Sequence, residues 1–292
     1  MSTRRRADRL LIVQLIIDPA SLEPFAGCVF VPTMGALHAG HGRLIEAAVA
    51  RREPGRAGVV VSVFVNPTQF NDPKDLERYP RTLDADLRLC EAAGASAVFA
   101  PTVEAVYPRD ARLSPPTATA LPGVATLPGL DDAHRRGHFA GVCQVVKRLF
   151  ELVRPRAALF GEKDWQQLQV IAAMTRGDGL GVEIVPVPTV REKDGLAMSS
   201  RNVFLTTEDR VRARSLSEAL CAANGEGTVR AAEERMRSVL EAARVAVEYA
   251  VVRDAETLMP LGETAQAGRA LIAARVGSVR LIDNAGWRAK GA

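Results

Sequence analysis

Short apolar runs alternate with amphipathic stretches along the first two thirds of the chain. The apolar runs predict strands at 28–31, 58–65, from 96, at 157–161 and from 182, and helical periodicity predicts helices at 42–52, 83–93, 139–153 and from 165. The run GVVVSVFV at 58–65 is almost wholly apolar, which is typical of a parallel strand buried on both faces. This alternation predicts an α/β fold with a Rossmann-like, doubly wound parallel sheet.

The pattern changes after residue 189. An arginine-rich helix is predicted from Thr206, a Gly-rich break follows at NGEGT, and another helix precedes short strands such as VEYAVV and VRLID. We therefore expect a second, smaller α+β C-terminal domain, with residues 1–189 in the first domain and 190–292 in the second. The segment 109–129 is rich in Pro, Ala and Gly, and we expect it to be a mobile surface segment.

Composition limits the classes of protein that fit. With 292 residues, 47% hydrophobic and 25% charged, the chain can bury the core of one large or two smaller domains. A formal net charge of +4 suits an anionic small molecule about as well as nucleic acid. The four cysteines are dispersed without a CxxC pair, so neither a disulfide framework nor a zinc site is indicated and a reducing cytoplasm is expected.

The first 21 residues imitate a secretory signal, because basic residues precede a short apolar run. However, the run 10–17 is interrupted by Gln14 and is followed by Asp18 and Pro19 without a small-residue cleavage site. It is also too short to span a bilayer. We predict a strand or helix of the fold there, and no membrane association.

The stretch VPTMGALHAGH contains two of the chain's four histidines, His38 and His41. A strand, a turn and then a helix place HAGH at the carboxyl edge of the sheet, where α/β folds bind phosphates. Gly40 lets the backbone approach a ligand, and two imidazoles can donate hydrogen bonds to phosphate oxygens. The alternative is that one histidine caps the helix and the other lies in the core with its ring nitrogens hydrogen-bonded to the protein.

HAGH resembles the HxGH signature of the nucleotidyltransferase superfamily, and the longer PTMGALHAGH resembles the pantothenate synthetase (pantoate–β-alanine ligase) family. The stretches SVFVNPTQF, YPRTLDADL, GHFAGV, LFGEKDWQQL and TVREKDGLAMSSRN follow in that family's order, and RALIAARVGSVRLIDN near the C-terminus is similar as well. The resemblance implies ATP-dependent ligation of pantoate and β-alanine to pantothenate, in coenzyme A biosynthesis. It implies a pantoyl-adenylate intermediate, release of pyrophosphate and AMP, a requirement for Mg²⁺, and a cytoplasmic homodimer whose C-terminal domain acts as a lid.

The same resemblance implies roles for individual residues. His38 and His41 face the phosphates, with His41 as the proton donor, while Lys163 adds positive charge. Ser199, Ser200 and Arg201 bind the β and γ phosphates as a KMSKS-like loop. The implied ATP-binding residues are Met34, Gly35, His38, Gly40, His41, Gly161, Lys163, Asp164, Val190, Met198, Ser199, Ser200 and Arg201.

Gln69 and Gln167 match the family's pantoate-contacting glutamines, and an amide can both donate and accept hydrogen bonds to a hydroxy acid. Asp86 matches one acidic position that lies near Mg²⁺ in the family. The alternative is that Asp84 and Asp86 are surface charges. The segment 114–132 is unlike the family's usual sequence, which leaves its part in the active-site wall or the dimer surface open.

Two other functions compete with this one. A different HxGH nucleotidyltransferase would transfer AMP or CMP to a phosphate-bearing acceptor, but Gln69 and Gln167 suit a hydroxy acid better than a phosphomonoester. A nucleic-acid-binding protein would exploit the basic surface. With 5% aromatic residues and no recognised nucleic-acid motif, the sequence argues against nucleic acid as a partner.

Overall fold

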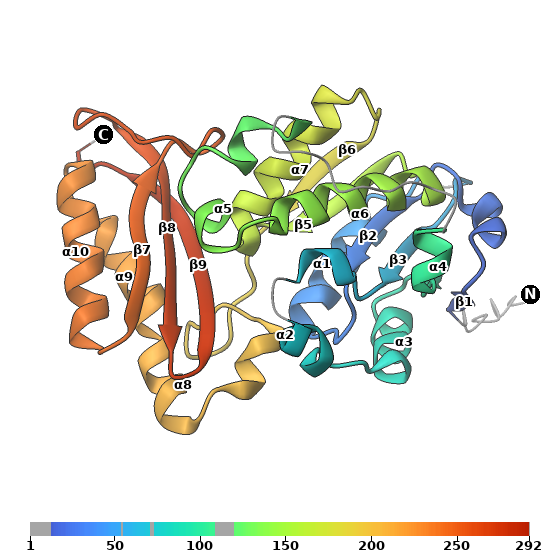
Figure 1. The fold of residues 1–292 in the computed structure, drawn as a ribbon, viewed down its shortest axis with the longest axis horizontal. Helices are drawn as coiled ribbons and strands as arrows, with labels where there is room; N and C mark the ends of the chain where they lie inside the picture. The colour runs from blue at the N-terminus through green and yellow to red at the C-terminus, as the bar shows by residue number, and fades with distance from the viewer. Residues whose placement is uncertain (1–12, 54, 71–72, 109–119, 292) are drawn as a thin grey trace, which may run out of the picture.

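The structure is a computed structural model that describes residues 13–53, 55–70, 73–108 and 120–291. Within this part of the chain, six parallel strands form the larger sheet in the order β1-β4-β3-β2-β5-β6 (Figure 1). These strands are β1 (Gln14–Ile16), β2 (Val29–Thr33), β3 (Val59–Val63), β4 (Ala97–Phe99), β5 (Ala157–Gly161) and β6 (Glu183–Val187). The chain builds outwards from β2 to β4 and later returns to the other side of β2, so the predicted doubly wound sheet is confirmed.

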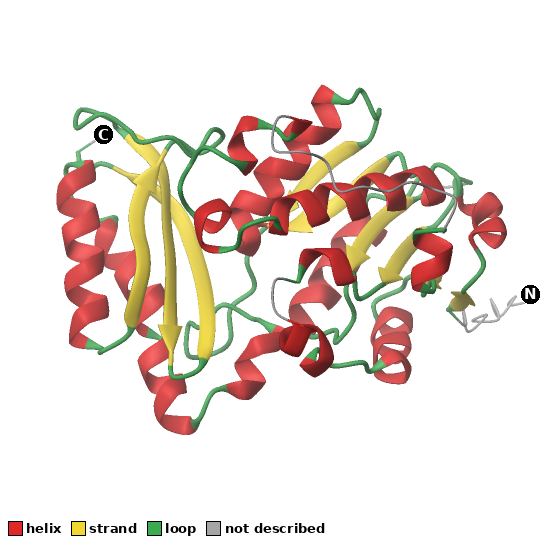
Figure 2. Cartoon of the chain, viewed as in Figure 1, coloured by secondary structure: helices red, strands yellow, loops and turns green. Residues whose placement is uncertain are grey.

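Helices cover both faces of this sheet (Figure 2). They are α1 (Ala39–Ala50) and α3 (Leu83–Ala92) on one face, and α6 (His138–Val153) and α7 (Trp165–Gly177) on the other. Alternate residues of β2 serve the two faces, because successive side chains of a strand point to opposite sides. Val29 and Val31 pack in the same cluster as Ile45 of α1, whereas Phe30 meets Phe150 of α6 with ring centroids 6.4 Å apart.

The prediction that 109–129 is a mobile surface segment is wrong for the surface position of Val124 and Ala125. Residues 109–119 lie outside the described residues, but η4 (Gly123–Ala125) packs into the main core, where Val124 is 9% and Ala125 4% exposed. The apolar side chains in the Pro- and Gly-rich stretch find a partner in α7, which composition alone does not show. The other short elements are η1 (Pro19–Phe25), η2 (Pro67–Gln69), α2 (Pro73–Arg78), α4 (Val103–Val106), α5 (Asp131–His134), η5 (Glu162–Asp164) and η6 (Ser200–Phe204).

The predicted α+β unit near the C-terminus is confirmed. An antiparallel sheet of β7 (Ala246–Arg253), β8 (Ala267–Val276) and β9 (Val279–Arg288) is covered on one face by α9 (Ser215–Ala223) and α10 (Val229–Ala242). The predicted arginine-rich helix consists of α8 (Thr207–Ala213) and α9. Strands β8 and β9 have 10 residues each and are longer than expected, because a tight turn at Gly277, with φ of +58°, joins them into a hairpin.

The two sheets share part of their cores. Val251 of β7 and Leu271 of β8 belong to the cluster that also contains residues of α6 and α7. The domain boundary predicted between residues 189 and 190 stays a prediction. At the other end of the chain, the apolar run 10–17 supplies the edge strand β1 with its described residues. No helix in residues 13–53, 55–70, 73–108 or 120–291 is long and apolar enough to cross a membrane.

Gly141 allows α6 to lie against the η2 turn. A Cβ atom at this position would stand 2.4 Å from the carbonyl oxygen of Thr68 and 2.8 Å from Cα of Gln69. We expect Gly141→Ala to lower the free energy of unfolding by about 1–3 kcal/mol, because the clash is with backbone that cannot rotate away. Gly177→Ala is the matched control, since nothing lies within 4 Å of its added Cβ. Urea denaturation compares the two, and equal stabilities would contradict the packing argument.

Candidate active site

A pocket opens at the carboxyl edge of the large sheet, where β2 and β5 end and α1 begins. Its wall includes Pro32 and Thr33 of β2, Phe160 of β5 and the segments 188–190 and 198–201. Of the predicted residues, those that line it are Met34, His38, Gly40, His41, Gln69, Gly161, Lys163, Asp164, Gln167, Val190, Met198, Ser199, Ser200 and Arg201. The predicted Gly35 and Asp86 do not line it. The fold therefore brings together predicted residues up to 167 positions apart, from Met34 to Arg201.

The two histidines are held by the start of α1. His38 is the residue that caps the helix, and its Nδ1 accepts a hydrogen bond of 3.1 Å from the backbone N–H of Gly40. His41 reaches back, so that its Nδ1 accepts from the backbone N–H of His38 at 3.2 Å. A ring nitrogen that accepts carries no proton, so each neutral ring has its proton on Nε2. Helix capping and hydrogen bonding to a ligand are therefore compatible, because the rings cap the helix through Nδ1 and leave Nε2–H for a ligand.

Both histidines are neutral at physiological pH. Burial lowers the pKa of His41 to about 3, and the neighbouring His38 contributes to this lowering. Burial also lowers the pKa of His38, with an added contribution from the positive charge of Lys163. The sequence resemblance made His41 a proton donor, and that role stays a prediction. The geometry favours donation of a hydrogen bond from its neutral Nε2–H.

Gly40 makes room for the His38 ring. A Cβ atom on Gly40 would lie 2.9 Å from Cε1 and 3.0 Å from Nδ1 of His38, and 3.5 Å from Cβ of Met198. A side chain here would push the ring off the helix N-terminus. The close approach of an imidazole therefore accounts for the glycine at this position.

The turn before His38 has an unusual backbone. Gly35 and Ala36 both have positive φ, +82° and +51°, so two successive residues are left-handed. The N–H groups of Ala36 and Leu37 then converge on the carboxylate of Asp86, at 3.1 and 2.8 Å. Thr82 donates its hydroxyl to the same carboxylate at 3.1 Å. Converging backbone N–H groups form an anion-binding nest, and here the anion is a side chain of the protein itself.

This arrangement leaves Asp86 poorly suited to hold Mg²⁺. Its side chain is 1% exposed and accepts three hydrogen bonds, and it is absent from the pocket wall. Among the residues that the structure describes, no group of three or more His, Cys, Asp or Glu could hold a metal ion. The alternative that both aspartates are surface charges is wrong for Asp86, although Asp84 is exposed. The residues present do not fit a metal ion bound directly by Asp86.

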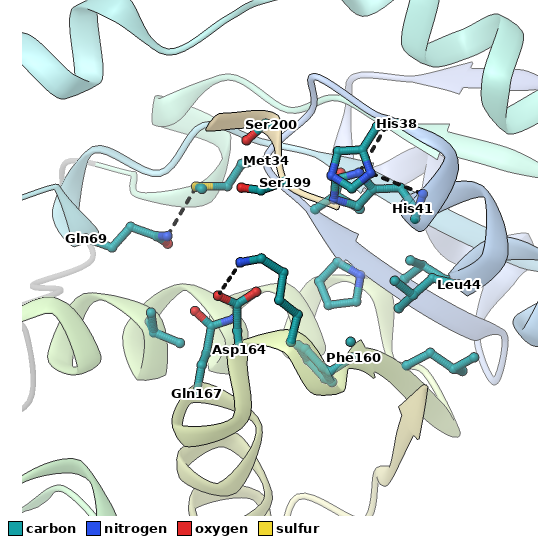
Figure 3. A pocket seen from close by; sticks show the side chains of 18 of the residues that line it. Met34, His38, His41, Leu44, Gln69, Phe160, Asp164, Gln167, Ser199 and Ser200 are labelled. Atoms are coloured by element: carbon teal, nitrogen blue, oxygen red, sulfur yellow. Dashed lines mark hydrogen bonds and ion pairs between the residues drawn. The ribbon is translucent and has the colours of Figure 1, made fainter. Parts of the chain in front are cut away.

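The two predicted glutamines approach the pocket from different elements. Gln69 of η2 is 9% exposed, and its Oε1 accepts from Nδ2 of Asn66 at 3.1 Å. Its Nε2 lies 3.1 Å from Sδ of Met34. In Figure 3, Gln69 and Met34 stand on one side of the pocket, and Gln167 and Asp164 rise from the other side. The amide of Gln69 is therefore held in one orientation, as recognition of a polar ligand requires.

The prediction of site residues missed six polar residues of the pocket wall, which are Thr33, Asn66, Tyr79, Arg135, His138 and Thr189. Arg135 Nη1 lies 2.9 Å from His138 Nε2, and His138 Nδ1 lies 3.0 Å from the backbone oxygen of Gln69. His138 therefore carries its proton on Nδ1 and fixes the backbone of Gln69. The sequence signal was available, because Asn66, Tyr79 and His138 lie inside the quoted motifs and Arg135 closely precedes one.

Burial affects the two members of this pair differently. It lowers the pKa of His138 to about 3, with a contribution from the charge of Arg135, so this imidazole is neutral. Burial lowers the pKa of Arg135 to about 10, which leaves the guanidinium charged at neutral pH. The pocket wall thus contains a fixed positive charge close to Gln69, which suits a carboxylate.

The side of the pocket next to the N-terminus of α1 contains further hydrogen-bond donors. Lys163 follows β5, and its Nζ lies 3.8 Å from Oδ1 of Asp164. Ser199 accepts a hydrogen bond from the backbone N–H of Arg201 at 3.2 Å and so caps η6. Together with the N-terminus of α1, these residues form a positively charged region able to receive a polyphosphate.

Comparison with known proteins shows the family of this chain. The family model described as pantoate-beta-alanine ligase matches residues 19–286. This chain belongs to the pantoate–β-alanine ligase family. A pantothenate synthetase of Rubrobacter xylanophilus is 52% identical over 263 residues, which are 87% of this chain and 89% of that one.

Solved structures of the pantoate–β-alanine ligase family share the fold. The crystal structure of pantothenate synthetase from Thermus thermophilus has a TM-score of 0.85 and 42% identity, covering 94% of this chain and 99% of that chain. A pantoate-beta-alanine ligase from Francisella tularensis, complexed with beta-gamma ATP and beta-alanine, has a TM-score of 0.74 and 29% identity, covering 94% and 97%. The resemblance found in the sequence is confirmed, and the chain is an enzyme of this family.

The hydrogen bonds predict opposite tautomers for His41 and His138. Nitrogen NMR should find His41 with its proton on Nε2 and His138 with its proton on Nδ1, and neither should titrate between pH 5 and 8. Because their pKa values are lower in the folded chain than in the unfolded chain, the unfolded chain takes up protons first as the pH falls. The free energy of unfolding should therefore decrease below about pH 6.5, by up to about 1.4 kcal/mol per pH unit for each histidine. A histidine signal titrating near neutral pH from either site would overturn this assignment.

Proposed function

We propose that this chain ligates pantoate to β-alanine at the expense of ATP, with a pantoyl-adenylate intermediate and release of pyrophosphate and AMP. One observation carries the proposal. The pocket joins a phosphate side, built from neutral imidazole N–H groups and cations, to an acid side built from two amides and Arg135. Family membership supports the same reaction. So does the similarity to the Francisella structure, which is complexed with beta-gamma ATP and beta-alanine.

In the first step a carboxylate oxygen of pantoate attacks the α-phosphorus of ATP, and the bond to pyrophosphate breaks. Negative charge moves onto the departing pyrophosphate. We assign its stabilisation to Nε2–H of His38 and His41, the ammonium of Lys163 and the loop Ser199–Arg201, because all of them line the same wall. Neutral imidazoles suit this task, since they donate without holding an ion pair to ATP before the reaction begins.

In the second step the amine of β-alanine attacks the acyl carbon, AMP leaves, and the attacking nitrogen loses a proton. We assign Gln69 and Gln167 to the hydroxyls of pantoate and Arg135 to a carboxylate. Fixed amides select a hydroxy acid because an analogue without the hydroxyl would leave them unpaired. We assign Met34, Gly40, Gly161, Asp164, Val190 and Met198 to the nucleotide, and Gly35 to the shape of the turn.

Mg²⁺ is proposed to enter with ATP. It commonly keeps several waters and is held mainly by substrate phosphates, where its charge offsets theirs. Asp86 is better explained as the anion that shapes the turn of Ala36 and Leu37, because its oxygens already accept hydrogen bonds from their N–H groups.

Three further proposals concern the whole molecule. Residues 190–292 act as a lid that carries Ser199–Arg201 and shields the adenylate from water.

The protein is a homodimer. Two exposed apolar residues at the edge of the large sheet support this proposal, Leu15 on β1 and Ile17 beside it, which are 41% and 54% exposed. Light scattering would give the mass of the particle in solution. A cytoplasmic location rests on the free cysteines, three buried and Cys221 exposed, and fractionation of the source cells tests it.

The reaction predicts an ordered release of products. With ATP, Mg²⁺ and pantoate alone, we expect a pyrophosphate burst of about one per site, and steady AMP release only after β-alanine is added. Quenched-flow analysis of both products measures this. A matched reaction with a phosphomonoester in place of pantoate is the control. Pyrophosphate release with that compound instead would indicate a different nucleotidyltransferase.

A substitution at Asp86 separates its two possible roles. Asp86→Asn places an amide N–H₂ against a backbone N–H, so we expect the turn to shift and kcat to fall about 10²-fold, by the same factor at every Mg²⁺ concentration. Asp84→Asn is the matched control, because it removes the same charge from the exposed position of the same helix turn. Recovery of Asp86→Asn activity by excess Mg²⁺ or Mn²⁺ would instead identify Asp86 as a metal ligand.

A further inference from the structure

The C-terminal motif ending in RLIDN has no part in the pocket wall, yet it ends in two buried polar residues. Asp283 and Asn284 lie next to each other on β9 and are each 3% exposed. Successive side chains of a strand point to opposite faces, so the two residues can serve different neighbours. Buried polar groups need partners, and those of Asp283 and Asn284 lie in two different loops of the pocket.

Asn284 holds the turn that carries Lys163. Its Nδ2 donates to the backbone oxygens of Glu162 and Lys163, at 3.0 and 2.8 Å. Its Oδ1 accepts from Nε of Arg269 at 2.7 Å, and Arg269 also reaches the Glu162 carboxylate at 3.1 Å. The Arg269 guanidinium stacks 3.6 Å from the ring centroid of Trp165. The second sheet therefore fixes both the backbone of this turn and the residues on each side of it.

Asp283 holds the other loop. Its carboxylate accepts two hydrogen bonds from Arg191, at 2.6 and 3.0 Å, in the fork geometry that is the strongest form of such a pair. Arg191 pairs with Ala197 across a short hairpin and donates to the backbone oxygen of Gly195 at 3.1 Å. Residue Met198 closes that hairpin and leads directly into Ser199–Arg201. The loop with the serines and arginine is thus attached to β9 at its base.

We infer that Asp283 and Asn284 are positioning residues that together set Lys163 and the Ser199–Arg201 loop against each other across the phosphates of ATP. The inference rests on the proposed function, because it assigns those groups to the phosphates. Adjacent residues of one strand hold both loops, so the position of Lys163 relative to Ser199–Arg201 is fixed. Transition-state stabilisation is sensitive to such placement, since a shift of about 1 Å can cost about 10²-fold in rate.

Asn284→Asp is the sharpest test, because it keeps the shape and the acceptor for Arg269 but turns the N–H₂ donor into an oxygen that faces two carbonyl oxygens. We expect kcat to fall about 10²-fold, with KM for pantoate changed less than about threefold. Asn224→Asp is the matched control. Its Oδ1 accepts from the N–H of Arg288 at 3.2 Å, a bond that aspartate retains, and it does not line the pocket.

Double-mutant cycles identify the residues through which each member acts. Asn284→Asp should cause no further loss of kcat in a Lys163→Ala background, but its full loss in an Arg201→Ala background. Asp283→Asn should show the reverse pattern. Additive losses in all four combinations would overturn the inference and leave only a structural role for the pair.

Near-ultraviolet circular dichroism and the melting temperature check that each variant is folded. If Asn284→Asp is unfolded, Asn284→Ser removes both donors without adding charge and the same cycles are measured with it. The wild-type reaction is run alongside every cycle. Absence of AMP formation by wild type would contradict the proposed function, whereas additive losses with an active wild type contradict only this inference.

Discussion

The contact between the Asp86 carboxylate and the backbone of Ala36 and Leu37 is the constraint on which the site depends. The left-handed conformation of Ala36 is costly because this residue has a Cβ atom, and the carboxylate compensates by accepting the N–H groups that the turn directs inward. This turn sets where α1 begins, because His38, which directly follows the turn, caps the helix. A buried charge outside the pocket wall thus determines where two imidazoles present their N–H groups.

The other hydrogen-bond donors of the pocket are also held by neighbouring groups of the protein. The helix N-terminus selects the tautomers of His38 and His41, His138 holds the backbone of Gln69, and β9 holds the turn of Lys163 and the hairpin that precedes Ser199. Burial keeps the imidazoles neutral while the arginine beside His138 stays charged. The pocket therefore combines neutral donors with cations in fixed places, which is what stabilisation of developing phosphate charge requires.

Much of the fold was predictable from the pattern of apolar residues. The run at 58–65 became β3, with Val59, Val60 and Val61 fully buried, because only a strand covered on both faces leaves no polar side. The packing of Val124 was not predictable, since its Pro- and Gly-rich neighbours have loop composition while its partner lies on α7. The β8–β9 hairpin was underestimated for a similar reason, because pairing across Gly277 extends strands whose own pattern is short.

The sequence by itself determined the parallel sheet, the family and a set of site residues most of which line the pocket, because local periodicity and motifs of about ten residues encode them. Only the tertiary structure decided the protonation of the histidines and the hydrogen-bond partners of Asp86, Asp283 and Asn284. These partners include residues 49 to 122 positions away in the chain, and the protonation depends on burial. Such surroundings exist only after the chain has folded, when the local dielectric and the hydrogen-bond partners of each group are fixed.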